Sequence, residues 1–222
     1  MPKPTFLNLP DEKRALIRQL ALEEFSEHPY GQASLSRVVA RAGIAKGSIY
    51  QYFENKFGLY VWLLDEIGRE KMAYVDTDRV RDGDFFERLD VSSRAALRFL
   101  REHPRMGRLG ARLHEPASDP QVREHHGALK RRGHAHLVAM IEGAQRHGEV
   151  RADVDPGLAA HLLANVLQAG LIDVFVERLG VPLRDYMSDP ALQARVSEED
   201  LDAMIADTLR VLRDGLGRRE GA

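Results

Sequence analysis

The sequence contains no cysteine, and this absence excludes disulfides, thiolate metal sites, iron–sulfur clusters and a cysteine nucleophile. It also lacks an uninterrupted apolar run of the roughly 18 residues that a membrane-spanning helix requires. The opening stretch MPKPTFLNLPDEKR lacks the continuous apolar region of a signal peptide. We therefore expect a protein of the reducing cytoplasm.

An excess of positive charge is also missing. The formal net charge is -2, which excludes a protein that coats nucleic acid by bulk positive charge. The distribution is uneven, because residues 1–60 contain eight basic and six acidic residues while the remainder is acidic overall. A local basic surface near the N-terminus is therefore possible, provided that the basic residues share one face.

Alternation of apolar and polar residues with period two is almost absent, so we expect no strands. Apolar spacings of three and four recur along all 222 residues, and 44% of the residues are hydrophobic. This pattern predicts an all-α protein with a substantial core. A capping box, formed by Ser197 and Asp200, is expected to open the last helix. We expect a polar break at 75–84 and helices at about 11–27, 34–42, 45–53, 55–74, 85–102, 104–114, 119–147, 156–179 and 198–214.

Residues 34–53, SLSRVVARAGIAKGSIYQYF, have the pattern of a helix-turn-helix. Apolar residues such as Val38, Ile44 and Ile49 would lock two short helices around a small shared core. Gly43 falls in the turn, where a positive φ is needed and where glycine meets no steric penalty. The pattern predicts that the second helix turns its opposite face toward solvent.

That exposed face carries groups suited to DNA. Lys46 and the N-terminal amides suit phosphate, while Ser48, Gln51 and the tyrosine hydroxyls can reach base edges or phosphates. Three neighbouring aromatic residues, Tyr50, Tyr52 and Phe53, cannot all face inward on one helix. The candidate DNA-binding residues are Ser34, Ser36, Lys46, Gly47, Ser48, Tyr50, Gln51, Tyr52 and Lys56.

At these residues the sequence resembles the TetR family of bacterial transcriptional regulators. The resemblance runs from about Arg14 to Leu63, and AGIAKGSIYQYFENKFGLY carries most of it. Val39, Gln51 and Phe57 depart from the family pattern, and the change at Gln51 bears on the operator sequence. The resemblance implies a homodimeric regulator, a repressor that binds a palindromic operator, with a DNA-binding domain at 1–54 and an effector-binding and dimerisation domain at 55–222.

The family also implies a cavity for a small effector within the larger domain. Large apolar residues on its helices are first of all expected to form the core, but as a group they are candidate pocket lining for an apolar or amphipathic molecule. His114, His161 and Gln168 are polar residues that could orient one end of such a ligand. The candidate ligand-binding residues are Phe99, Met106, Leu113, His114, Met140, Leu167, Gln168, Leu171 and Phe175.

Dimerisation is expected on physical grounds as well, because one short recognition helix reads too few bases to select a site in a genome. The predicted helix at 156–179 is apolar over more than one stripe, so a second face must be covered. The candidate residues for this seam are Leu162, Val166, Leu209 and Leu212.

Other chemistries have weaker support in the sequence. GIAKGS lacks the Gly-Lys-Ser/Thr order of a phosphate loop, and closely spaced histidines such as His125 and His126 diverge on a helix. We therefore expect no metal, no cofactor and no enzymatic activity. Two alternatives are a helical small-molecule-binding protein without specific DNA binding and, less favoured, an all-α enzyme.

Overall fold

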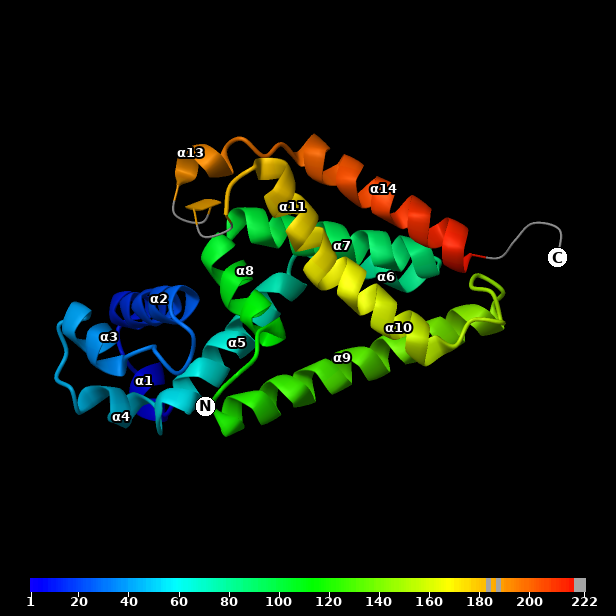
Figure 1. Ribbon diagram of the computed structural model, residues 1–222. Coiled ribbons are helices and arrows are strands. Elements are labelled where there is room, and N and C mark those ends of the chain that lie inside the picture. The colour runs from blue at the N-terminus through cyan, green and yellow to red at the C-terminus, as the bar shows by residue number, and fades with distance from the viewer. Residues whose placement is uncertain (183–184, 187–188, 218–222) are drawn as a thin grey trace. The chain divides into compact units, whose positions relative to one another are not determined.

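Figure 1 shows the computed structural model of the chain, which describes residues 1–182, 185–186 and 189–217, apart from the side chains of Gln168, Ala169, Ile172 and Pro190. Within these ranges every named element is a helix, and one isolated antiparallel bridge joins Val150 to Gly217. The expected all-α class is confirmed. In this part of the chain, no helix combines the length and the apolar character needed to cross a bilayer.

Most of the predicted helices are found close to their expected ranges. The elements are α1 (Pro4–Leu7), α2 (Asp11–Glu27), α3 (Leu35–Arg41), α4 (Ser48–Tyr52), α5 (Lys56–Met72), α6 (Thr77–Asp82), α7 (Phe85–Glu102), α8 (Pro104–Ala111), the 3-10 turn η1 (Arg112–His114), α9 (Pro120–Arg146), α10 (Pro156–Ala164), the π-helical η2 (Asn165–Gly170), α11 (Leu171–Leu179), α13 (Pro190–Gln193) and α14 (Glu198–Leu216). The capping box of α14 is confirmed, with Ser197 and Asp200 bonded reciprocally.

The helices pack into two compact units. Unit 1 comprises Met1–Glu70 and Arg105–His126, and unit 2 comprises Lys71–Pro104 and Gly127–Ala222. Unit 1 therefore combines the N-terminal helices with a later segment of the chain. The boundary at residue 54 between a DNA-binding domain and an effector-binding domain stays a prediction.

An aromatic cluster forms the core at the N-terminal end of unit 1. Phe6 of α1 is 1% exposed, and its ring centroid lies 4.8 Å from that of Phe53 and 5.1 Å from that of Trp62. Phe25 and Tyr60 pack together in the same unit, with their ring centroids 5.2 Å apart. Aromatic residues bury large apolar areas, so this cluster contributes strongly to the stability of unit 1.

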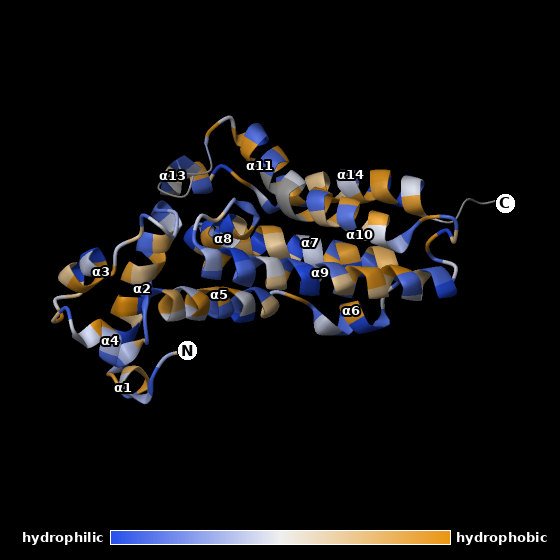
Figure 2. Ribbon diagram, turned by 60° about the horizontal axis from the view of Figure 1, so that its bottom comes forward, coloured by the Kyte–Doolittle hydropathy of each residue, from blue (hydrophilic) through white to orange (hydrophobic). Residues whose placement is uncertain are grey.

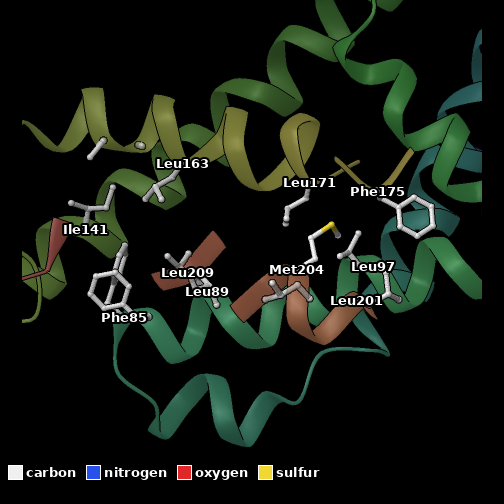
Figure 3. Close-up of a cluster of buried hydrophobic side chains, with 14 of the residues drawn as sticks. Phe85, Leu89, Leu97, Ile141, Leu163, Leu171, Phe175, Leu201, Met204 and Leu209 are labelled. Carbon is white, nitrogen blue, oxygen red and sulfur yellow. The ribbon is translucent and has the colours of Figure 1, made fainter. Parts of the chain in front are cut away.

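The core of unit 2 is aliphatic for most of its length. α7 packs against α14, and the buried side chains between the helices include Leu89, Leu97 and Leu201 (Figure 3). Figure 3 shows Phe85 and Phe175 toward opposite ends of this cluster. In Figure 2 the helices carry both hydrophobic and hydrophilic residues, as expected where one face of each helix is buried.

Three helices lie where the sequence predicted none: α1, α6 and α13, the last of which falls between the predicted helices at 156–179 and 198–214. α6 occupies the expected polar break at 75–84, and no residue of it is buried, so it has no apolar period to detect. Asp76 starts this helix by accepting a hydrogen bond from the backbone N–H of Arg79 at 3.0 Å. α1 was also missed, because only one of its four residues, Phe6, is buried.

The single apolar helix predicted at 156–179 is divided in the structure. The π-helical stretch η2 separates α10 from α11. Gly170 has a steric role here, since a Cβ at this position would lie 3.3 Å from the carbonyl oxygen of Asn165. Such wide turns reorient the residues that follow them, so the apolar stripes of α10 and α11 do not form one uniform face.

Candidate nucleic-acid interface and regulatory clefts

The turn between α3 and α4 has the geometry that the sequence predicts. Gly43 adopts a φ of +62°, which confirms its expected conformation. The backbone N–H of Ile44 donates to the carbonyl of Val39 at 3.2 Å and closes the turn. Val38 and Ile49 are each 1% exposed, so the two short helices share a buried core. This arrangement is a helix-turn-helix.

The outer face of α4 presents the candidate base-reading residues. Tyr50 is 49% exposed, and Lys46 and Gln51 are also exposed. Tyr52 is only 7% exposed, and its ring centroid lies 5.9 Å from that of Phe6. Tyr52 therefore has a packing role that the sequence did not assign, while its contact with DNA stays a prediction.

The remaining candidates surround this face unevenly. Gly47 and Ser36 are exposed, whereas Ser34 and Ser48 are half-buried. Ser34 precedes α3 as its N-cap, but its side chain makes no capping hydrogen bond. Its role as a DNA contact stays a prediction.

A segment before α2 holds the end of α4. The amine of Lys3 donates to the carbonyl of Tyr50 at 2.8 Å, and the backbone N–H of Lys3 donates to the carbonyl of Tyr52 at 2.8 Å. The hydroxyl of Thr5 donates to the carbonyl of Gln51. These contacts satisfy carbonyls that the end of a helix leaves without an intrahelical partner. The sequence analysis missed this support, because its donors lie more than forty residues away in the chain.

A buried carboxylate positions the start of α3. Glu24 is 5% exposed and accepts a hydrogen bond from the backbone N–H of Ser34 at 2.7 Å. Nε of Arg37 donates to its two oxygens at 3.1 and 3.0 Å. Burial by itself would raise the pKa of Glu24, but the hydrogen bonds from Arg37 and Ser34 outweigh it and leave the pKa below its ordinary value. Glu24 is therefore ionised at neutral pH and joins α2 to α3.

A second buried carboxylate connects α2 with both α3 and the start of α8. Glu23 is 8% exposed, and its Oε2 accepts a hydrogen bond from Arg41 at 2.6 Å. Arg105 lies 3.6 Å from Oε1 of the same carboxylate. Nearby, Arg112 is 5% exposed and donates to the carbonyl of Ser26 at 2.9 Å. The segment 105–126 is thus bonded to the helix that supports the helix-turn-helix.

The last predicted DNA contact, Lys56, lies beside an aromatic group of unit 1. Its amine is 4.4 Å from the centroid of the Tyr30 ring, a cation–π contact. Burial lowers the pKa of Lys56, and the charge of Asp119 opposes this shift. The ring centroid of Tyr60 lies 5.2 Å from that of Tyr30, and the hydroxyl of Tyr60 is hydrogen-bonded to Nε2 of His126 at 2.9 Å. Lys56 is half-buried, and its contact with phosphate stays a prediction.

The predicted ligand-binding residues do not all belong to one unit. Met106, Leu113 and His114 are in unit 1, and the others are in unit 2. Phe99 and Leu171 are buried at 3% and 2%, while Leu167 is half-buried. The side chain of Gln168 lies outside the described residues. The role of all of these residues in ligand binding stays a prediction.

Two clefts lined by described residues open on unit 2, and each includes one predicted residue. The first has a volume of about 270 Å³ and is lined by Met140 together with Phe85, Arg88, His136 and His147. The second has a volume of about 200 Å³ and lies between the end of α11 and the first turns of α14, with Phe175 in its lining. Arg178 and Arg195, at the edge of the second cleft, were missed. Arg178 has no acidic residue three or four positions away, and this is the sequence signal that could have singled it out.

The predicted seam of the dimer is only partly exposed. Leu158, Leu162 and Val166, four residues apart, are 58%, 54% and 37% exposed on α10 and η2. Leu209 is 9% exposed and belongs to the core of its own chain, so its assignment to the seam was wrong. On α14 the exposed apolar residue is Val211, at 73%.

Within the described ranges, no three histidine, aspartate or glutamate side chains converge as a metal site would require. What the geometry defines is a helix-turn-helix DNA-binding protein with a separate helical unit that offers clefts of small-molecule size.

Comparison with known proteins agrees with this class. Residues 17–61 match the model of the bacterial regulatory proteins of the tetR family. A crystal structure of a TetR family transcriptional regulator from Chloroflexus aurantiacus is 26% identical, with a TM-score of 0.79, and the match covers 99% of this chain and all of that one. The HTH-type regulator YdgC of Bacillus subtilis is 23% identical over 182 residues, which cover 72% of this chain and 93% of the relative.

Two further matches are regulators of fatty acid metabolism. The fatty acid metabolism regulator protein of Bacillus subtilis is 33% identical over 82 residues, which cover 36% of this chain and 35% of the relative. FadR from the same organism, solved in complex with stearoyl-CoA, has the same fold, with a TM-score of 0.66 at 18% identity over 90% of this chain and 98% of that one. The chain thus carries the DNA-binding motif of the tetR family at residues 17–61, has the fold of a TetR family regulator along its length, and is a DNA-binding transcriptional regulator.

Proposed function

We propose that this protein is a dimeric repressor that binds a palindromic operator and is released by a small apolar or amphipathic molecule. The observation that carries the proposal is the exposed face of α4, where Tyr50 and Gln51, with Lys46 just before the helix, lie beside a buried helix-turn-helix core. The proposed DNA contacts are those predicted from the sequence. The protein acts in the cytoplasm, by binding and not by catalysis.

The exposed stripe on α10 and η2 supports the dimer. Leu158, Leu162 and Val166 form a line of apolar side chains at a spacing of four residues, and such a line is stable when another apolar surface covers it. A two-fold dimer would place two recognition helices about one DNA turn apart, roughly 34 Å, and would double the contacts on a palindrome.

Residues 105–126 provide the route for the response to ligand. They belong to unit 1, but the chain on both sides of them belongs to unit 2. Arg105 and Arg112 bind Glu23 and the carbonyl of Ser26 on α2. A ligand that changes the arrangement of unit 2 would act through this segment on the helix-turn-helix. A coupling of about 1–3 kcal/mol would weaken operator binding roughly 5- to 150-fold, and DNA would weaken ligand binding by the same factor.

The fatty acid regulators among the similar proteins support an amphipathic effector, since one of them was solved with stearoyl-CoA. The two clefts of unit 2 have volumes of about 270 and 200 Å³. Pockets for drug-sized ligands typically have volumes of about 300–1,000 Å³. These dimensions favour an effector that is smaller than a long-chain acyl-CoA.

Selection of bound duplexes from a random pool tests the DNA-binding part. We expect enrichment of a palindrome by the unmodified protein and relaxed preference at particular bases for Tyr50→Ala and Gln51→Ala. Lys46→Ala should weaken binding to all sequences and reduce the salt slope by about two for a dimer. Arg81→Gln, which removes one charge from α6, is the matched control. It should change neither the base preference nor the salt slope of DNA binding. If no palindrome is enriched, sequence-specific repression is excluded.

A further inference from the structure

We propose that the cleft between α11 and α14 binds a small amphipathic anion, a carboxylate with a short apolar chain. The cleft is lined by residues of the end of α11, the connection after α13 and the first two turns of α14. The proposal names the chemical class of the effector, and its consequence for DNA binding rests on the proposed function.

The floor of the cleft is apolar. Phe175, Leu201 and Met204 are 3%, 3% and 2% exposed, and they lie at one end of the buried cluster in Figure 3. Leu179 and Val196 are half-buried at its sides. Because Phe175 and Met204 can adjust their contacts to an inserted chain, this floor suits the hydrocarbon part of a ligand.

Two arginines give the rim its positive charge. Arg178 and Arg195 are exposed side chains, and among the described residues neither guanidinium makes a hydrogen bond or an ion pair within 4 Å. Elsewhere along α14 the arginines of unit 2 are paired, as Arg98 is with Glu198 at 2.9 Å. The two rim arginines are therefore available to a ligand.

The one acidic residue of the lining is already engaged. Asp200 accepts hydrogen bonds from the hydroxyl of Ser197 at 2.6 Å and from its backbone N–H at 3.3 Å. Its charge also acts on Arg178, without a hydrogen bond between them. Two arginines and one aspartate leave the lining with one net positive charge, so a monoanion complements it. Guanidinium groups bind carboxylates through charge-assisted hydrogen bonds.

The cleft lined by Met140 and Phe85 offers less to an anion. Its Glu149 accepts a hydrogen bond from the backbone N–H of Phe85 at 2.8 Å, and Nε of its Arg88 donates to the carbonyl of Gly83 at 2.9 Å. The arginine of that cleft is thus already bound to the backbone. The α11–α14 cleft, with two arginines that lack such partners, is the better match for a carboxylate.

Calorimetric titration of the full chain with sodium octanoate and with 1-octanol tests the proposal. The two probes share the apolar chain and differ in charge. We expect octanoate to bind at least about tenfold more tightly than octanol, since two arginines can hold the carboxylate. Arg178→Gln and Arg195→Gln should each lower the affinity for octanoate about tenfold and leave the affinity for octanol unchanged. Arg81→Gln removes a charge outside the cleft and should leave both affinities unchanged.

The outcomes separate this proposal from the proposed function. Three results would each overturn the anion site: equal affinities for the two probes, no octanoate binding at millimolar concentration, or unaltered octanoate binding by both cleft variants. None of these results would affect DNA binding, which duplex selection measures separately. Octanoate binding that depends on the arginines but leaves operator affinity unchanged would support the site and overturn its regulatory role. Circular dichroism of the variants, whose substituted side chains are exposed, checks that they remain folded.

Discussion

Gly43 is the residue whose identity the backbone dictates most directly. Its φ of +62° costs an L-residue with a Cβ about 1–2 kcal/mol. A Cβ here would meet no atom within 4 Å, so the cost of substitution comes from the backbone conformation and not from a clash. The turn of the helix-turn-helix therefore depends on the absence of a side chain.

Substitution of Gly43 by alanine should lower the free energy of unfolding by about 1–2 kcal/mol. Gly68→Ala is the matched control, because Gly68 lies inside α5 with open space around it, and alanine should stabilise that helix by about 0.5–1 kcal/mol. Urea denaturation, followed by the fluorescence of the one tryptophan, Trp62, measures both changes. Equal effects of the two substitutions would contradict the argument from φ.

Glu24 acts at the same scale through its charge. Its folded pKa lies below the ordinary value of 4.5, so its contribution to stability is complete above pH 4.5 and is lost as the pH falls through the lower folded pKa. Glu24→Gln should destabilise the protein by about 1–2 kcal/mol at neutral pH, and the difference from the unmodified protein should shrink in acid below 4.5.

The control for this prediction is Glu27→Gln, which changes an exposed carboxylate of the same helix. It should alter neither the stability at neutral pH nor its acid dependence. Unfolding curves at neutral pH and in acid measure the free energy of unfolding of each variant. A constant difference between Glu24→Gln and the unmodified protein across this range would show that the charge of Glu24 is not what stabilises α3.

At the scale of elements, the short helix α1 is the support for α4. Its residues and Lys3 hold the last carbonyls of α4, and Phe6 fills the space between Phe53 and Trp62. A five-residue helix has little stability of its own, since helices in isolation need about 12–15 residues to persist. α4 therefore depends on these contacts for its shape.

Phe6→Ala should destabilise unit 1 by about 3–5 kcal/mol, because it removes a fully buried ring and leaves a cavity. Operator affinity should fall with it, since α4 loses its packing partner. Leu7→Ala is the control, as Leu7 is in the same helix but 53% exposed, and it should change the stability by less than about 0.5 kcal/mol. Denaturation monitored through Trp62, 5.1 Å from Phe6, measures the effect. Similar stabilities for the two variants would argue against a structural role for α1.

At the scale of the whole molecule, the exposed apolar stripe bears on assembly. Leu162→Lys introduces a charge into the middle of that stripe and should convert the proposed dimer into monomers, because an unpaired charge would be buried in the proposed interface. Operator binding should weaken in parallel. Met72→Lys, which changes another exposed apolar residue, should leave the dimer intact. Sedimentation at micromolar protein gives the result, and a monomeric unmodified protein would exclude this interface.

Much of this molecule could be predicted from local sequence alone. The helix boundaries of α2 and α7, the conformation of Gly43 and the capping box of Ser197 follow from periodicity and from short-range hydrogen bonds, which act between residues a few positions apart. The resemblance around AGIAKGSIYQYF identified the class of protein for the same reason, since the helix-turn-helix is built from one continuous stretch.

The tertiary structure alone decided which groups meet over long separations. Lys3 reaches the carbonyl of Tyr50, Arg112 reaches that of Ser26, and Phe175 shares a cleft with Arg195, although no local pattern connects these residues. It also placed Tyr52 and Leu209 inside the core, where the sequence had assigned them to surfaces. Periodicity tells which residues share a face of a helix, but packing decides what covers that face. The DNA-binding motif could therefore be found in the sequence, whereas the support of α4 and the charged cleft of unit 2 arise only when distant segments fold together.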